Sequence, residues 1–174
     1  MKRRKGSIML KTIIYINISI IVLVGVYSVT YKVYEVYERN LCVSEMREMA
    51  EKVEDRITYE LGNSIGIKKI TSAGNEKFKE KSQRSKYKDC LRVRKILYST
   101  YFFEDSGEEF VSDKAIEQKY GNIYITGNGD YQIGNKVKSM YIMKKYLNEK
   151  TELDFIIVYK LKKYEYISRF SVYI

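Results

Sequence analysis

Few side chains in this sequence could do chemistry, and their types exclude several kinds of site. The 174 residues contain no histidine, which removes the commonest general base and the commonest zinc ligand. The acidic pairs Glu104-Asp105 and Glu108-Glu109 flank a Ser-Gly turn, a pattern typical of solvated loop charges. No glycine-containing stretch matches a phosphate-binding loop. We therefore expect no enzyme activity, no metal site and no cofactor.

The two cysteines, Cys42 and Cys90, are too far apart in the sequence for a metal-knuckle or redox-pair motif. Two alternatives remain for them. Outside the cytoplasm they could form one disulfide, which would close a loop of about 48 residues and stabilise the fold by about 2–4 kcal/mol. Otherwise they are two buried thiols that do not meet, which is the alternative we favour.

The charge distribution argues against a nucleic-acid-binding surface. The formal net charge is +10, but five of these charges lie in the first 31 residues, which contain no acidic group. The rest of the chain mixes Lys and Arg with Asp and Glu, so it predicts a mildly basic surface and no continuous basic stripe. No specific nucleic acid is predicted as a partner.

The element that must position everything else is an apolar stretch near the start of the chain. From Thr12 to Tyr31, twenty residues carry no charge and are dominated by Ile and Val. A helix of this length rises about 30 Å, enough to cross the hydrocarbon core of a bilayer. The flank on its N-terminal side is basic, with Lys2, Arg3, Arg4, Lys5 and Lys11. This predicts a single-pass anchor in the cell membrane, with the N-terminus cytoplasmic and the C-terminal domain outside.

Two other interpretations of this stretch fit the sequence less well. A secretory signal peptide has a shorter apolar region that ends in small residues, whereas here Tyr27, Tyr31 and Tyr34 follow the apolar run. A buried helix of a soluble protein is less consistent still, because a small domain does not normally hide twenty uncharged residues. Both are weaker than the membrane anchor.

Beyond the anchor the sequence predicts that the same helix continues in amphipathic form. Apolar residues recur every three or four positions on one face: Cys42, Met46, Met49, Val53, Ile57 and Leu61. Gly62 lies where a helix terminator is expected. A single helix from about Thr12 to Leu61 is therefore predicted, and its apolar stripe needs a partner.

That partner is predicted to be an antiparallel β-sheet, which gives an α+β fold. Apolar alternation indicates strands at 91–102, 121–126, 131–133, 153–161 and 164–173. Between two of them, Gly127-Asn128-Gly129-Asp130 predicts a hairpin turn. Residues 138–147 fit a strand or a helix, and their Tyr and Ile content favours a strand. Residues 64–70 fit either a strand or a loop, 74–89 fit a solvated loop, and 113–119 fit one helical turn.

The helix and the residues before it resemble the type IV pilin superfamily, which includes type II secretion and competence pseudopilins. Arg4-Lys5-Gly6 followed by Ser7-Ile8-Met9-Leu10 is similar to the end of the short basic leader of that family. The resemblance implies cleavage after Gly6 by a prepilin peptidase and methylation of Ser7 as the new N-terminus. It also implies membrane lipid and other pilin or pseudopilin subunits as partners.

One residue departs from the family pattern. The family usually has Glu at the fifth mature position, where it offsets the N-terminal amine of a neighbouring subunit, and this chain has Lys11 there. A cation cannot pair with that amine, and two close ammonium groups repel in a low-dielectric environment. Some minor, tip-located pseudopilins resemble this chain in lacking that Glu, so the resemblance points to a minor subunit. Alternatively, Lys11 simply extends to the membrane edge as part of the basic flank.

These observations predict an organisation and a function. The expected parts are a cytoplasmic leader (1–6), the transmembrane half of the helix (7–31), its amphipathic half (32–62), a variable region with one or two strands (63–119) and a β-meander (120–174). The expected function is a minor pilin-like or pseudopilin-like subunit of a type IV pilus, competence or type II secretion filament. The alternative is a signal-anchored extracytoplasmic binding or accessory protein unrelated to pili.

Overall fold

The computed structural model describes residues 2–78, 87, 89–103, 109–127, 129–147 and 150–174. The chain forms two compact units, Met1–Leu41 and Cys42–Ile174. One helix, α1 (Lys2–Gly62), contributes residues to both units. All of the strands belong to the second unit, so each unit is described separately below.

Helix α1 ends where the sequence predicted but begins ten residues earlier than Thr12. The chain contains no proline, so nothing in its first residues removes a backbone donor from the helix. At the other end, the backbone N–H of Asn63 donates to the carbonyl oxygen of Tyr59 at 3.2 Å. The hydroxyl of Ser64 donates to the carbonyl oxygen of Leu61 at 2.7 Å, which satisfies one of the last carbonyls of the helix.

The strands form one antiparallel sheet. They are β1 (Ser64–Lys77), β2 (Leu91–Phe103), β3 (Glu109–Lys119), β4 (Asn122–Thr126), β5 (Tyr131–Gly134), β6 (Val137–Leu147), β7 (Lys150–Leu161) and β8 (Tyr164–Tyr173). Their order in the sheet is β5-β4-β3-β2-β6-β7-β8, and β1 also pairs with β2. The α+β fold expected from the sequence is therefore confirmed.

Strand β2 joins two three-stranded meanders. Val93 pairs with Ser72 of β1 and with Met140 of β6, so β1 and β6 lie on opposite edges of β2. Ile96 pairs with β1 and with Ile116 of β3, so β3 lies on the same edge of β2 as β6. The meanders β3-β4-β5 and β6-β7-β8 thus separate along one edge of β2, which curves the sheet around α1.

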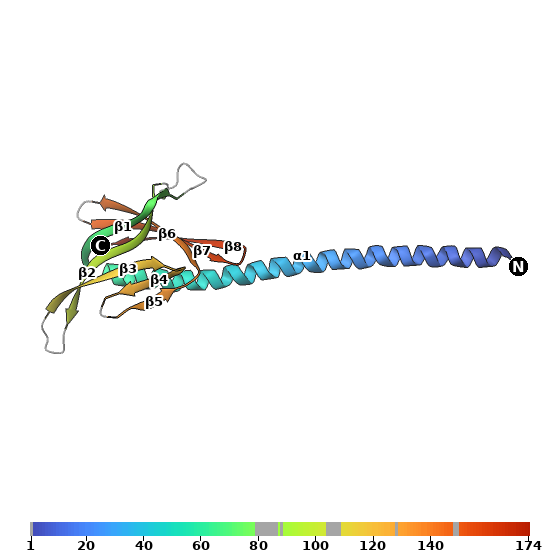
Figure 1. The fold of residues 1–174 in the computed structure, drawn as a ribbon, viewed down its shortest axis with the longest axis horizontal. Helices are drawn as coiled ribbons and strands as arrows, with labels where there is room; N and C mark the ends of the chain where they lie inside the picture. The colour runs from blue at the N-terminus through green and yellow to red at the C-terminus, as the bar shows by residue number, and fades with distance from the viewer. Residues whose placement is uncertain (1, 79–86, 88, 104–108, 128, 148–149) are drawn as a thin grey trace. The chain divides into compact units, whose positions relative to one another are not determined.

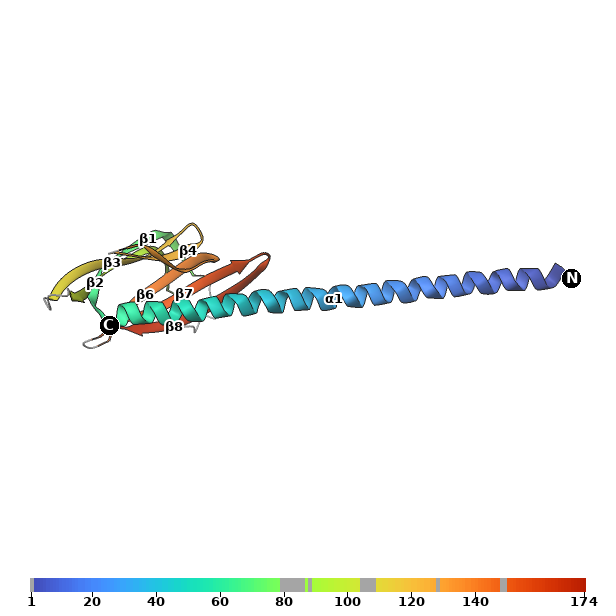
Figure 2. The same ribbon diagram turned by 90° about the horizontal axis from the view of Figure 1, so that it is seen from below.

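The inner face of the sheet packs on one side of the C-terminal part of α1 within the second unit (Figure 1 and Figure 2). The helix contributes a buried face of Met46, Ala50, Val53, Ile57 and Leu61. Along β7 alternate residues belong to this core, namely Leu153, Phe155, Ile157 and Tyr159. The predicted apolar face of the helix is confirmed, although Met49 is only partly buried and Ala50 takes a place in the core.

The outer face of the sheet carries a smaller apolar cluster. Successive side chains of a strand point to opposite faces, so Ile156 and Val158 of β7 lie on the face away from the helix. They pack with Cys90, and Phe78 and Tyr87 also pack against this cluster. These three residues, which precede β2 in the chain, therefore cover part of the outer face.

Two parts of the sequence-based strand assignment are wrong, and both errors have the same cause. Residues 74–77, expected in a loop, belong to β1, and residues 113–119, expected to form a helical turn, belong to β3. In each case pairing with β2 decides the local conformation, and Ile116 gains complete burial as a strand residue. The rest of the predicted loop at 79–86 and 88, and the acidic residues Glu104, Asp105 and Glu108, lie outside the described residues.

Candidate functional sites along the helix

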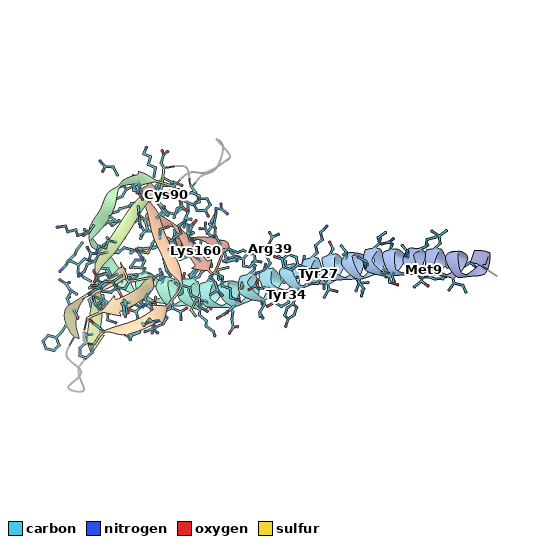
Figure 3. The ribbon with its side chains drawn as sticks, turned by 45° about the vertical axis from the view of Figure 1, so that its right-hand side comes forward. Met9, Tyr27, Tyr34, Arg39, Cys90 and Lys160 are labelled. Carbon is cyan, nitrogen blue, oxygen red and sulfur yellow. The ribbon has the colours of Figure 1, made fainter. Side chains whose placement is uncertain are left out.

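The first part of α1 is long and apolar enough to cross a membrane. Its side chains are exposed in the described structure, and Figure 3 shows Met9, Tyr27 and Tyr34 pointing outward from the helix. The hydroxyls of Thr12 and Thr30 donate to the carbonyl oxygens one turn earlier, at 3.0 and 2.9 Å. These polar groups are therefore satisfied inside the helix, as an apolar solvent requires.

Exposed tyrosines gather near the C-terminal end of this apolar part: Tyr27, Tyr31, Tyr34 and Tyr37. Tyrosine is enriched where a membrane-spanning helix meets water, because its ring is apolar and its hydroxyl is polar. Five basic residues precede the uncharged stretch, and the tyrosines named above gather at its opposite end. This arrangement fits a helix that crosses a bilayer once.

The residues of the predicted processing site all lie within α1. Gly6 and Ser7 are helical, so the expected boundary between leader and helix is not marked by a break in the secondary structure. Lys11 follows Ser7 by four residues and is exposed. Positions four apart share a face of a helix, which places Lys11 on the same side of α1 as the expected new N-terminus.

Cys42 and Cys90 are both buried and are not bonded to one another. Cys42 lies on the face of α1 that packs on the sheet, whereas Cys90 packs with Ile156 and Val158 on the opposite face of the sheet. Figure 3 labels Cys90 among the strands. Because the sheet lies between the two faces, the structure agrees with the alternative of two buried thiols.

A buried carboxylate near the end of α1 was not anticipated from the sequence. Glu60 is 5% exposed, and four donors surround its two oxygens. The hydroxyls of Tyr131 and Tyr98 donate to Oε1 and Oε2 at 2.7 and 3.0 Å. Arg56 Nη2 lies 2.7 Å from Oε1, and Lys114 Nζ lies 3.3 Å from Oε2. We call these five residues the Glu60 cluster.

Opposing effects set the pKa of Glu60. Burial alone would raise it, but the hydrogen bonds from Tyr131 and Tyr98 and the charge of Lys114 together hold the pKa below its ordinary value of 4.5. Burial raises the pKa of Tyr98, and the adjacent Glu60 carboxylate raises it further. The cluster is therefore stable as a carboxylate held by neutral hydroxyls and two cations.

The Glu60 cluster connects four elements of the second unit. Arg56 and Glu60 come from α1, Tyr98 from β2, Lys114 from β3, and Tyr131 begins β5. The sequence contained one usable signal for this cluster. Arg56 and Glu60 are four residues apart on a predicted helix, a spacing that favours an ion pair. Nothing in the sequence indicated that a glutamate next to Leu61 would be buried.

A second buried carboxylate lies on the outer face of the sheet. Asp154 of β7 is fully buried, and Lys145 Nζ and Ser171 Oγ each lie 2.6 Å from one of its oxygens. The hydroxyl of Tyr173 donates to Glu152 at 3.1 Å nearby. These contacts connect β6, β7 and β8. Among the described residues, no group of three acidic, Cys or His side chains is arranged to hold a metal ion.

No known family model, curated protein or solved structure matches this chain. The functional argument therefore depends on the residues described above. Two features carry it: the exposed apolar part of α1 in the first unit, and the Glu60 cluster in the second.

Proposed function

We propose that the chain is a subunit of a surface filament of the type IV pilin kind. The first part of α1 holds it in the membrane before assembly and packs against the helices of other subunits afterwards. The second part of α1 fixes the β-domain. This proposal is supported by the properties of α1 and by the pilin-like residues around Gly6.

The observation that carries the proposal is the length over which α1 exposes apolar side chains. The exposed apolar residues run from Ile8 to Leu41, which corresponds to about 50 Å of helix. A bilayer's hydrocarbon core is only about 30 Å thick, so lipid tails can cover about twenty of these residues. Val33, Tyr37 and Leu41 lie beyond that span and are 63%, 63% and 57% exposed.

Helices of neighbouring subunits would cover the exposed apolar side chains that lie beyond the reach of the lipid tails. The uncharged part of α1 up to Tyr31 is apolar on all sides, and such a helix is stable either in lipid or inside a helical bundle. Beyond it, Val33, Tyr37 and Leu41 are spaced four apart among charged residues and form one apolar stripe that a neighbouring helix can cover. A subunit that moves from the membrane into a filament exchanges one of these environments for the other. The amphipathic part of α1 from Met46 to Leu61 does not need such partners, because the sheet already covers its apolar face.

The charge of Lys11 supports a minor position in such a filament. After cleavage, the amine of Ser7 and the ammonium of Lys11 would lie one helical turn apart on the same face. Two cations at this separation repel each other in a medium of low dielectric constant. By the family resemblance, Lys11 would also face the N-terminal amine of a neighbouring subunit of the same kind. A bulk subunit would meet that second repulsion at every contact with its own kind, whereas a subunit present once per filament would not.

The test is the mature N-terminus of the full chain in cells that contain a prepilin peptidase. Mass spectrometry is expected to find a chain that begins at a methylated Ser7, both in membranes and in sheared filaments. Gly6→Leu should retain the leader, while Gly25→Leu, in the middle of the apolar part, should be processed normally. A chain that keeps its first six residues in these cells would contradict the proposal.

A second measurement separates the filament subunit from an anchored accessory protein. Lys11→Glu supplies the carboxylate that pilin-like subunits carry at this position, and Lys11→Gln removes the cation without supplying it. We expect Lys11→Glu to increase the amount of chain in sheared filaments more than Lys11→Gln does. If all three forms stay in the membrane fraction, the alternative of a signal-anchored accessory protein replaces the filament subunit.

A further inference from the structure

A groove with a volume of about 530 Å³ lies at the C-terminal end of α1, next to the Glu60 cluster. Its floor contains Glu60, and its rim contains Arg56 and Tyr59 of α1, Tyr101 of β2 and Lys114 of β3. The rim therefore contains two cationic and two aromatic side chains. The groove belongs to the second unit alone and does not depend on the membrane anchor.

The groove has a surplus of positive charge. Glu60 is the sole acidic side chain among the described residues that line it, and four donors already saturate its oxygens. Two cations, Arg56 and Lys114, share this one negative charge. Their side chains remain 42% and 27% exposed, so both can reach a further acceptor in the groove. One unit of positive charge is left for a ligand.

The aromatic side chains offer flat faces next to this charge. Tyr59 is 61% exposed and Tyr101 is 50% exposed. The guanidinium carbon of Arg56 lies 5.3 Å from the ring centre of Tyr59 and 5.2 Å from that of Tyr131, so the cation is held between two rings. The rim is thus ordered before any ligand arrives, which lowers the entropic cost of binding.

The remaining lining is polar. Thr100 and Asn63 complete it, and the hydroxyl of Thr100 donates to the carbonyl oxygen of Asn63 at 3.4 Å. Within the described part of the chain, no aliphatic side chain lines the groove. A pocket for an apolar peptide side chain would have an aliphatic lining, whereas a ligand with many hydroxyl groups needs polar partners and flat rings.

We propose that this groove binds an acidic saccharide, a pyranose ring that carries one carboxylate. The carboxylate pairs with Arg56 and Lys114, the C–H face of the sugar ring lies on Tyr101, and the hydroxyls meet Thr100 and Asn63. Each chemical feature of a uronic-acid unit thus has a counterpart in the lining. This inference does not rest on the filament proposal, because it concerns the β-domain however the chain is anchored.

The test uses the full chain in detergent micelles and two matched probes. Oligogalacturonic acid carries the carboxylate, and its methyl ester has the same rings without the charge. Titration calorimetry is expected to show saturable binding of the acid with a dissociation constant between about 10 µM and 1 mM. The ester should bind at least about tenfold more weakly, because it cannot pair with the surplus positive charge.

Two variants test the aromatic contact. Tyr101→Ser removes an exposed ring that takes no part in the Glu60 cluster and should weaken binding of the acid by at least about tenfold. Tyr146→Ser is the matched control, since Tyr146 is 77% exposed and lies beside a cation, Lys144, outside the groove. It should bind like the unchanged chain.

The proposal is overturned by any of three results. These are no saturable binding of the acid up to about 10 mM, equal affinity for acid and ester, or an unchanged affinity of Tyr101→Ser. Saturation-transfer NMR on the unchanged chain gives an independent readout that needs no variant. The ring protons of the sugar should receive magnetisation from tyrosine, and a uniform or absent transfer would also count against the groove.

Discussion

Gly134 of β5 lies directly against Val53 of α1, and a Cβ atom at position 134 would overlap the Cγ2 methyl group of Val53. The glycine is required here for space, because its backbone φ is not in the left-handed region. Both residues are buried. This contact allows the short edge strand β5 to lie on the helix.

The change Gly134→Ala should therefore reduce the free energy of unfolding by about 1–3 kcal/mol through overpacking. Urea denaturation of the full chain in micelles measures it. Gly66→Ala is the matched control, since nothing lies within 4 Å of a Cβ built at that strand position. In the double variant Gly134→Ala with Val53→Ala, the two losses should not add, because removing the valine methyl groups makes room for the new one. Additive losses would contradict the contact.

Tyr159 has a hydroxyl that is buried without a hydrogen-bond partner among the described residues. Its side chain is fully buried on the inner face of β7, and burial raises its pKa, so it stays neutral. A buried polar group without a partner costs about 1–3 kcal/mol. Tyr159→Phe should therefore leave the free energy of unfolding unchanged or increase it by up to about 1 kcal/mol. The control is Tyr98→Phe, which removes a hydrogen-bond donor from Glu60 and should decrease the free energy of unfolding. A clear loss in Tyr159→Phe would mean that its hydroxyl has a partner.

The sequence predicted the helix and most of the strands because these depend on local patterns. The end of α1 at Gly62 and the alternation in β7 each depend on residues that are adjacent in the sequence. The turn between β4 and β5 was also predicted correctly at Gly127 and Gly129, because glycines at such a position favour a hairpin. Asn128 of that turn lies outside the described residues.

The features that sequence reasoning missed depend on contacts between distant residues. Residues 113–119 look polar enough for a helical turn, and only pairing with β2 makes them a strand. In the sequence Glu60 looks like an ordinary solvated helix residue, and only the folded structure brings the hydroxyls of Tyr98 and Tyr131 from two strands to its carboxylate. The groove at the end of α1 has the same origin, since its lining comes from α1, β2 and β3.

The positions of Cys42 and Cys90 predict slow thiol chemistry. Their exposed fractions are 3% and 0%, and they lie on opposite sides of the sheet. A maleimide reagent should therefore modify both at less than about a tenth of its rate in urea, because a buried thiol reacts only when the structure opens. Non-reducing electrophoresis of the folded chain should show no intramolecular disulfide. A disulfide that forms without denaturant would contradict the placement of the two residues.

Replacement of the Glu60 carboxylate should remove an acid-sensitive part of the stability. The pKa of Glu60 is lower in the folded chain than its ordinary value of 4.5, despite the opposing effect of burial. A group of this kind contributes stability that is complete above its ordinary pKa and is lost as the pH falls through the folded pKa. Glu60→Gln should therefore cost about 1–3 kcal/mol at pH 7 and progressively less below pH 4.5.

Glu54, on the same helix, provides a control with the opposite sign. Burial raises its pKa above 4.5, and the charge of Asp55 adds to this effect, while a hydrogen bond with Ser168 opposes it. Its ionisation therefore opposes folding, and the stability associated with it is lost as the pH rises through the folded pKa. Glu54→Gln should therefore increase the free energy of unfolding at pH 7 and have no such effect at low pH. Glu60→Gln should decrease the free energy of unfolding most at pH 7. Urea unfolding of both variants at pH 3, 5 and 7 measures the two slopes. If the free energy of unfolding changes with pH in the same way in both variants, the Glu60 cluster does not hold its carboxylate in the charged form. A carboxylate stabilised by Tyr98, Tyr131 and Lys114 must titrate differently from one that is only desolvated.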